Sequence, residues 1–166
     1  MKKIIEQYDQ PGEWEVKIPF AKMGEEKEWV GVVKAMTPGT YNLSVTAEHS
    51  ARGTRGRITV KAVAARGAVV NISGMIKIHK AAQQTDDFLE LRVLTLDPAA
   101  RATAEPKLEI EADDVKASHA ASVGPVDPEQ FLYLMSRGLG EEQAKESIVD
   151  GFLQITQPLV IKLGHV

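Results

Sequence analysis

Apolar and polar residues alternate in short runs between about residues 13 and 117. Leu43 and Val45 alternate with Ser44 and Thr46, for example. A period of two is typical of strands that bury one face. The same alternation recurs in runs around Val60, Ile76, Leu91 and Ile110. The pattern therefore predicts a mainly β chain.

Turn signals separate these runs at fairly regular intervals, as at Pro38-Gly39, Arg66-Gly67 and Asp97-Pro98. The gaps carry no helical pattern, so a sandwich, a barrel and a β-helix all remain open. Few Asn-Gly or Asp-Gly pairs mark tight hairpins, which favours a solenoid whose core is made by stacking rungs. At ~20–45 residues per repeat, the β region supplies about three to six rungs with exposed ends.

After residue 125 the period changes to that of helices. Asp127 is placed as an N-cap, Pro128 stands at the first helical position, and Gln130 follows three residues after the cap. Arg137 lies in the last turn and Gly138 is placed to end the helix. These signals predict a first helix from about Pro128 to Arg137.

A second helix is expected to start near Gly140, because Ala144, Ile148 and Phe152 follow at four-residue spacing. The loop between the two helices is short, which predicts a helical hairpin. The chain thus divides into a β core at 1–125, a hairpin at 126–156 and a tail at 157–166. No pattern decides the structure of residues 1–12 or of the tail.

Charge and composition exclude several function classes. The net charge is −3 with no basic patch, which argues against nucleic-acid binding. No apolar run approaches the ~20 residues of a membrane span. The start MKKII is followed at once by Glu6, unlike a signal peptide, so we expect a cytoplasmic protein without membrane contact. There is no cysteine, so this chain has no thiolate for zinc, catalysis or an iron–sulfur cluster.

Candidate chemistry centres on His119, whose imidazole is a suitable ligand for iron or zinc. A lone histidine is more often structural, and one ligand does not make a metal site. Asp113 and Asp114 could serve as a metal or acid–base pair, but turn chemistry is favoured, since adjacent strand residues point to opposite faces.

Two further polar groupings allow a catalytic interpretation. Glu48-His49-Ser50 suggests a triad, yet no nucleophile elbow or oxyanion loop accompanies it. His79, Gln83, Thr85 and Asp86 are better explained as a turn between strands. A hydrolase is therefore a third hypothesis, without a supporting motif.

The apolar residues of the hairpin are expected to be mostly core. Another side of the hairpin is expected to face a partner, because aromatic, Met and Arg side chains are frequent in interfaces. The expected core set is Phe131, Tyr133, Leu134, Met135, Ile148 and Phe152. The predicted partner-binding set, which shares Tyr133, is Glu129, Tyr133, Arg137, Glu141 and Lys145.

Long stretches of the chain resemble one family. These are HSARGTRGRITVKAVAARGAVVNISGMIKIHKAAQQTD, KLEIEADDVKASHAASVGPVDPEQFLYLMSRGL and EEQAKESIVDGFL, within residues 40–153. Together they resemble the SufB/SufD family of iron–sulfur cluster assembly scaffolds, and SufD more than SufB. The resemblance implies a right-handed parallel β-helix and a C-terminal helical subdomain that docks an ABC-type ATPase, SufC. It also implies pairing of SufB with SufD through the β-helix ends, where a nascent cluster forms.

The chain departs from this family at positions that bear on chemistry. Ala117 stands where SufD-like chains often have Cys, and Ala120 stands where SufB-like chains carry Glu. Compared with the family, we also expect a shorter protein, without the N-terminal helical domain and much of the β-helix of typical members.

By resemblance we expect a non-enzymatic, SufD-like scaffold that docks a SufC-like ATPase through its C-terminal helices. Its other partner would be a SufB-like homologue or a second copy in a homodimer. A transient iron–sulfur cluster is implied at the interface, with no cofactor held by this chain alone. The alternative is a metal- or cluster-binding protein that uses His119 across a homodimer interface.

Overall fold

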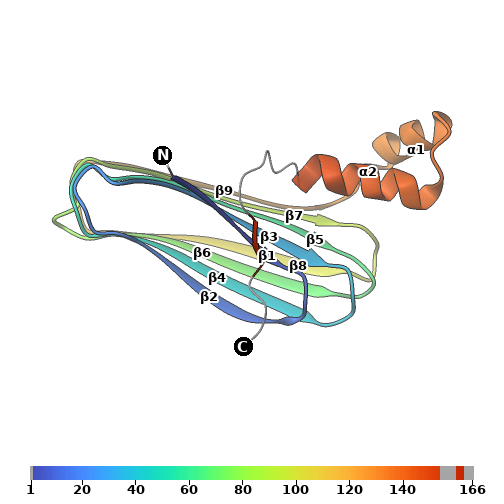
Figure 1. The fold of residues 1–166 in the computed structure, drawn as a ribbon, viewed down its shortest axis with the longest axis horizontal. Helices are drawn as coiled ribbons and strands as arrows, with labels where there is room; N and C mark the ends of the chain where they lie inside the picture. Colours follow the sequence, from blue (N-terminus) through green and yellow to red (C-terminus); the bar gives the residue numbers. More distant parts are fainter. Residues whose placement is uncertain (1, 154–159, 163–166) are drawn as a thin grey trace.

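The computed structural model describes residues 2–153 and 160–162. Strands make up most of the chain and two helices follow them (Figure 1). The elements are β1 (Lys2–Tyr8), β2 (Gly12–Phe20), β3 (Glu26–Ala35), β4 (Thr40–His49), β5 (Arg55–Ala64), β6 (Val69–Ile78), β7 (Thr85–Thr95), β8 (Arg101–Ile110), β9 (Val115–Pro125), α1 (Pro128–Ser136), α2 (Glu141–Leu153) and β10 (Val160–Lys162).

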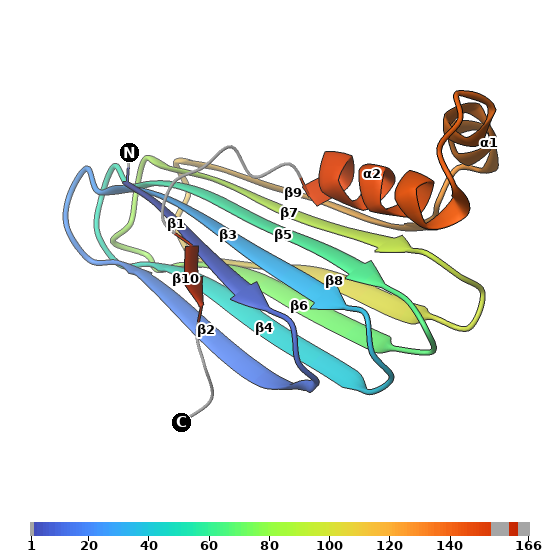
Figure 2. The ribbon, with the colours of Figure 1, turned by 45° about the vertical axis from the view of Figure 1, so that its right-hand side comes forward.

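The strands form two parallel sheets that face each other as a solenoid (Figure 2). Sheet A has the order β10-β1-β3-β5-β7-β9 and sheet B the order β2-β4-β6-β8. Consecutive strands alternate between the sheets, so each turn of the chain adds one strand to each sheet, and about four turns result. Each turn uses about 30 residues, within the usual solenoid range. This confirms the predicted parallel β-helix followed by C-terminal helices.

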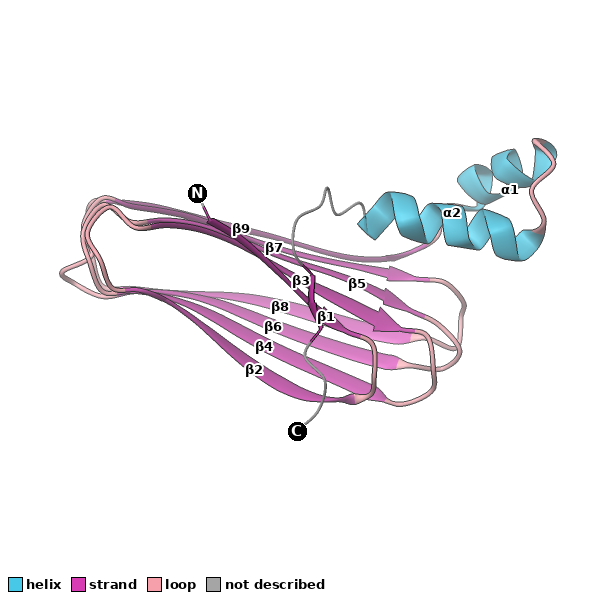
Figure 3. Ribbon diagram, viewed as in Figure 1, coloured by secondary structure: helices cyan, strands magenta, loops and turns pink. Residues whose placement is uncertain are grey.

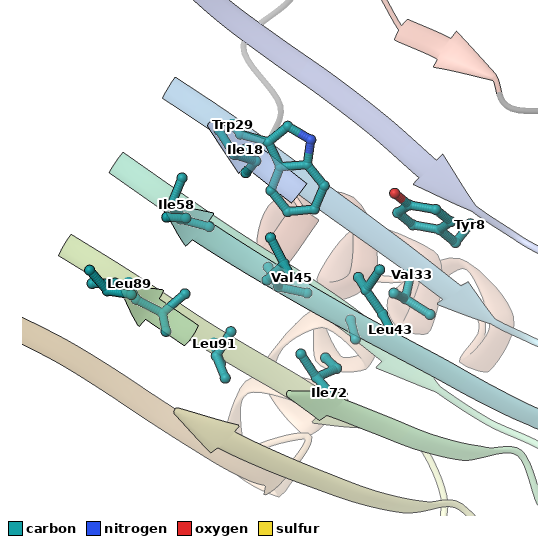
Figure 4. Close-up of a cluster of buried hydrophobic side chains, with 14 of the residues drawn as sticks. Tyr8, Ile18, Trp29, Val33, Leu43, Val45, Ile58, Ile72, Leu89 and Leu91 are labelled. Carbon is teal, nitrogen blue, oxygen red and sulfur yellow. The ribbon is translucent and has the colours of Figure 1, made fainter. Parts of the chain in front are cut away.

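The core lies between the two sheets. On β4, Leu43 and Val45 are buried while Ser44 between them is exposed, as the period-2 pattern predicts. Register then aligns equivalent residues in rows along the solenoid. Trp29, Ile58 and Leu89 are successive partners in sheet A, and each is at most 2% exposed. Figure 4 shows these side chains gathered between the sheets.

The first turn of the solenoid is closed by aromatic side chains and by β10. At the first turn, the rings of Tyr8 and Trp14 lie 5.0 Å apart, and the Tyr8 hydroxyl donates to Glu6 (2.6 Å). Burial, and next this bond to Glu6, raise the pKa of Tyr8 well above its usual value. β10 covers the edge of β1, with Ile5 opposite Val160. Of the predicted tail, only residues 160–162 are described; 157–159 and 163–166 lie outside the described residues.

Figure 3 shows the two helices beside the strands. Local signals set the ends of these helices. The Asp127 side chain caps α1 by accepting a bond from the Glu129 amide (2.9 Å). Gly138 follows α1 with φ +95°, a conformation that favours glycine and ends the helix. α2 follows Gly140, whose amide donates to the Gln143 side chain (3.1 Å), as in a capping box. No helix in the described part of the chain is long and apolar enough to cross a membrane.

α2 packs on the outer face of sheet A through its C-terminal half. Leu153 (4% exposed) lies in a second apolar cluster with Ile5, Val30, Val32 and Val63. Ala144 and Ile148 are also buried, as expected, whereas Phe152 is only half-buried and Leu153 takes the buried position. The expectation that α1 contributes to the core is wrong, because no α1 residue is buried.

Candidate functional site

The last turn of the solenoid leaves its core-facing side open. Among the described strands, β8 pairs only with β6, and β9 only with β7. Leu108 and Ile110 continue the buried rows of Ile76 and Ile78, yet they are 38% and 41% exposed. Val123 on β9 is 45% exposed. This end therefore presents apolar side chains and two unpaired strand edges, the kind of surface that pairs with another chain.

His119 lies on this open end. Its register partner in β7 is Leu89, which is fully buried, so His119 lies on the core-facing side of β9. No further strand covers this side among the residues described, and His119 is exposed. Ala117 and Ala121 are the neighbouring residues on the same side of β9. The imidazole therefore has no bulky neighbour on its own strand face.

The structure does not assemble a metal site around His119 within one chain. In the part of the chain that the structure describes, no group of three or more His, Asp or Glu residues is arranged to hold a metal ion. Asp113 and Asp114 lie in the bend between β8 and β9. The backbone of Asp114 bonds to the preceding turn, through its amide to the Gln83 side chain (2.9 Å) and its carbonyl to the Gln84 amide (2.6 Å). This supports the turn interpretation of the two aspartates.

A buried polar network crosses the core near the ends of β4 and β7, and sequence reasoning missed it. His49 Nε2 donates to Asp87 Oδ2 (2.7 Å), and His49 Nδ1 lies 2.8 Å from Thr54 Oγ1. Thr54 Oγ1 lies 3.0 Å from Thr85 Oγ1. The four side chains are at most 1% exposed, and the His49 ring stacks on Phe20 with 4.1 Å between centroids.

This network has the order of a catalytic triad but not its accessibility. Asp87, His49 and Thr54 follow one another as acid, base and hydroxyl, yet water and substrate have no access to any of them. The arrangement therefore has a structural role in the core. Burial of an unpaired polar group is unfavourable, and the hydrogen bonds of His49 pair it with Asp87 and Thr54. The sequence singled out His49 and Thr85 in separate groupings, but no local pattern linked them to Asp87, which lies 38 residues from His49.

The polar cluster predicted around His79 does not converge. His79 Nε2 donates to Glu48 Oε1 (2.7 Å) on the outer face of sheet B, and this bond lowers the pKa of Glu48. Thr85 instead points into the core network, while Asp86 is exposed. Gln83 bonds to the neighbouring turn. These residues build the connection between β6 and β7, as the turn interpretation predicted.

The hairpin places the five predicted partner-binding residues in two pairs and a single position. On α1, the Arg137 guanidinium lies 5.2 Å from the centre of the Tyr133 ring. On α2, Lys145 Nζ lies 2.7 Å from Glu141 Oε1, and this bond lowers the pKa of Glu141 and raises that of Lys145. The Glu129 side chain is exposed in the first turn of α1.

α1 also presents apolar side chains to solvent. The sequence predicted Tyr133 and Met135 in the core and assigned no role to Leu132. Leu132 is 64% exposed, Tyr133 56% and Met135 40%. The hairpin touches the solenoid mainly through α2, where Lys61 Nζ donates to the carbonyl of Phe152 (2.9 Å). A cation at this position suits the negative end of the helix dipole. α2 is thus anchored at its last turn, and α1 extends from it without a buried face.

Comparison with known proteins gives consistent matches. A family model described as "SUF system FeS cluster assembly, SufBD core domain" matches residues 15–152. The chain is 41% identical to the iron–sulfur cluster assembly protein SufD of Bacillus subtilis over 114 residues, which are 69% of this chain and 26% of that protein. It is 49% identical to a SufBD family iron–sulfur cluster assembly protein of Mycobacterium leprae over 103 residues, 55% of this chain and 26% of that protein.

A third match is to the SufD protein of Escherichia coli, with 39% identity over 88 residues, 52% of this chain and 21% of that protein. The chain therefore spans only about a quarter of the length of these relatives, or less.

Proposed function

Because the chain belongs to the SufBD family of iron–sulfur cluster assembly proteins, we propose that it is a SufD-like, non-enzymatic scaffold. In this proposal, the hairpin at 126–156 docks a SufC-like ABC ATPase. The open end of the β core at 1–125 pairs with a SufB-like homologue or with a second copy of the chain. The scaffold transmits the motion of the ATPase to the interface at that end.

The observation that carries the docking proposal is the exposed apolar surface of α1. Leu132, Tyr133 and Met135 project from a helix that buries none of its residues. A helix that is left without a covered face gains stability when a partner covers it. Tyr133 with Arg137 over its ring supplies two of the residue types that contribute most to binding energy in protein interfaces.

Isothermal titration calorimetry with the SufC-like ATPase of the same genome tests this proposal. We expect micromolar or tighter binding to the wild-type chain, and about tenfold or greater weakening in Tyr133→Ala. Met23→Ala is the matched control, since Met23 is an 81% exposed apolar residue in the turn between β2 and β3. No binding by the folded wild-type chain, or equal weakening in Met23→Ala, would overturn the docking proposal.

Pairing through the open end is supported by Leu108, Ile110 and Val123, whose counterparts in the preceding turns are buried. Adjacent residues of β9 point to opposite faces, which offers a matched pair of substitutions. Val123→Asp puts a charge on the core-facing row, and Ser122→Asp puts the same charge on the outer face. Sedimentation velocity should show that only Val123→Asp dissociates a homodimer or a pair with the homologue. Equal behaviour of the two variants would contradict pairing at this end.

The alternative function is metal or cluster binding by His119 of two protomers. The exposed position of His119 on the face proposed to pair favours it, because two-fold pairing would bring two imidazoles to one interface. Anaerobic reconstitution with iron and sulfide, followed by absorption spectra and iron content, tests this directly. His119→Ala should abolish uptake, while His79→Ala, which removes another solvent-accessible imidazole, should not. Unchanged uptake in His119→Ala would reject the alternative.

A further inference from the structure

A pocket of about 420 Å³ lies where α2 meets the outer face of sheet A and the start of α1. It is separate from the open end of the solenoid and from the exposed side chains of α1. Its lining combines cationic, polar and apolar side chains from four elements and one connection. The lining residues are Lys61, Arg92, Leu94, Val126, Gln130, Ser147, Ile148, Gly151 and Phe152.

Two cations share this pocket. Lys61 on β5 and Arg92 on β7 are register partners on the outer face of sheet A, and both lie over the ring of Phe152, at 5.9 and 5.7 Å. Burial, and next the charge of Arg92, lower the pKa of Lys61. The carboxylate of Glu90 acts in the opposite direction but does not line the pocket. Among the described residues that line it, none is acidic.

The pocket is rich in hydrogen-bond donors. The Lys61 ammonium uses one of its three N–H groups on the Phe152 carbonyl, and the Arg92 guanidinium carries five N–H groups. The Ser147 hydroxyl and the Gln130 amide add further donors. Adjacent cations without a lining counter-ion repel each other, and an anion between them removes that repulsion. Leu94, two residues from Arg92 on the same face of β7, and Ile148 on α2 add apolar lining.

We propose that this pocket is a binding site for a small organic anion. A carboxylate or phosphate group would be held by Lys61 and Arg92, and its apolar part would lie against Leu94 and Ile148. Because Lys61 also holds the last turn of α2, the anion strengthens the attachment of the hairpin to the solenoid. The site is independent of any protein partner, so its test uses the chain alone.

Amide chemical shifts of Ser147 and Gly151 in the full chain report occupancy. Phosphate and hexanoate are titrated separately, with sodium chloride at equal ionic strength as the reference. Saturable shifts beyond the chloride effect are expected with at least one anion. Saturation by phosphate assigns a phosphate group to the ligand, and saturation by hexanoate assigns a carboxylate with an apolar tail.

Arg92→Gln should weaken this binding about tenfold or more, since charge-assisted bonds are strong relative to neutral ones. Arg57→Gln is the matched control, because Arg57 is exposed on the same face of β5 and lies over a ring of its own, Phe88. Ser147→Ala, a change on the exposed side of α2, provides a second weakening variant that leaves the charges of sheet A intact. Shifts no larger than those with chloride, or equal affinity in Arg92→Gln and Arg57→Gln, would overturn the proposal.

Discussion

Replacing Asp87 with alanine removes the hydrogen-bond partner that His49 Nε2 has among the described residues, at a site where both side chains are at most 1% exposed. Breaking a buried histidine–carboxylate pair typically lowers the free energy of unfolding by about 3–5 kcal/mol. Asp87 Oδ1 has no partner among the described residues, so removing that buried oxygen offsets part of the loss. We therefore expect the lower end of the range, about 3 kcal/mol.

Urea unfolding followed by tryptophan fluorescence measures this loss, because Trp29 is buried in the same core. Asp86→Ala is the matched control: Asp86 is the preceding residue on β7 but is exposed, and a change within about 0.5 kcal/mol is expected. His49→Phe combined with Asp87→Ala should be more stable than Asp87→Ala alone. Phenylalanine retains the stacking on Phe20 and leaves no ring nitrogen unpaired.

A loss below about 1 kcal/mol for Asp87→Ala, or a loss equal to that of Asp86→Ala, would refute the view that this pair stabilises the core. A double variant no more stable than Asp87→Ala would show that the cost does not come from the unpaired imidazole. The slope of the unfolding free energy against urea concentration should stay unchanged, since the surface exposed on unfolding is the same.

Three further outcomes follow from the geometry. Gly56→Ala should lower the free energy of unfolding by about 1–3 kcal/mol in the same urea assay, because a Cβ would lie 2.4 Å from Asp87 Cγ; a neutral effect would contradict this close packing. Gly151→Ala should raise the melting temperature, since alanine favours helix by about 0.5–1 kcal/mol and the added Cβ meets nothing within 4 Å; an unchanged melting temperature would count against this. Acidification should reduce the helicity of α2, measured by circular dichroism. Lys145 lowers the folded pKa of Glu141, so the Glu141–Lys145 ion pair stabilises α2 above that pKa and is lost as pH falls through it. Glu141→Gln should flatten this acid dependence, and an unaltered profile would contradict it.

The local signals of the chain predicted its elements well. Alternation such as that of Leu43 and Val45 with Ser44 predicted strands, and the structure buries the apolar members. Asp127 and Gly138 marked the ends of α1, and both act there as predicted. These predictions were possible because strand periodicity and helix capping depend on residues within a few positions of each other.

The local pattern did not predict what covers the apolar face of α1 or the core-facing side of β9. Amphipathic spacing placed Phe131 and Met135 of α1 in the core, but no residue of α1 is buried. Periodicity identifies an apolar face without stating whether this chain or another one covers it. Position 119 was identified from the sequence as a candidate ligand, yet its place on an open solenoid end became visible only from the pairing of β9 with β7.

The sequence by itself determined the mainly β character, the turns and the capped hairpin, because each depends on neighbouring residues. The tertiary structure decided which distant residues meet. Stacking of turns about 30 residues long brought Asp87 to His49. Docking of α2 buried Val63, although it alternates with the core-facing Ala62 of its strand. Such contacts join residues far apart in the chain, and no local period encodes them. They arise only when parallel register aligns one turn with the next and a helix covers the outside of the sheet.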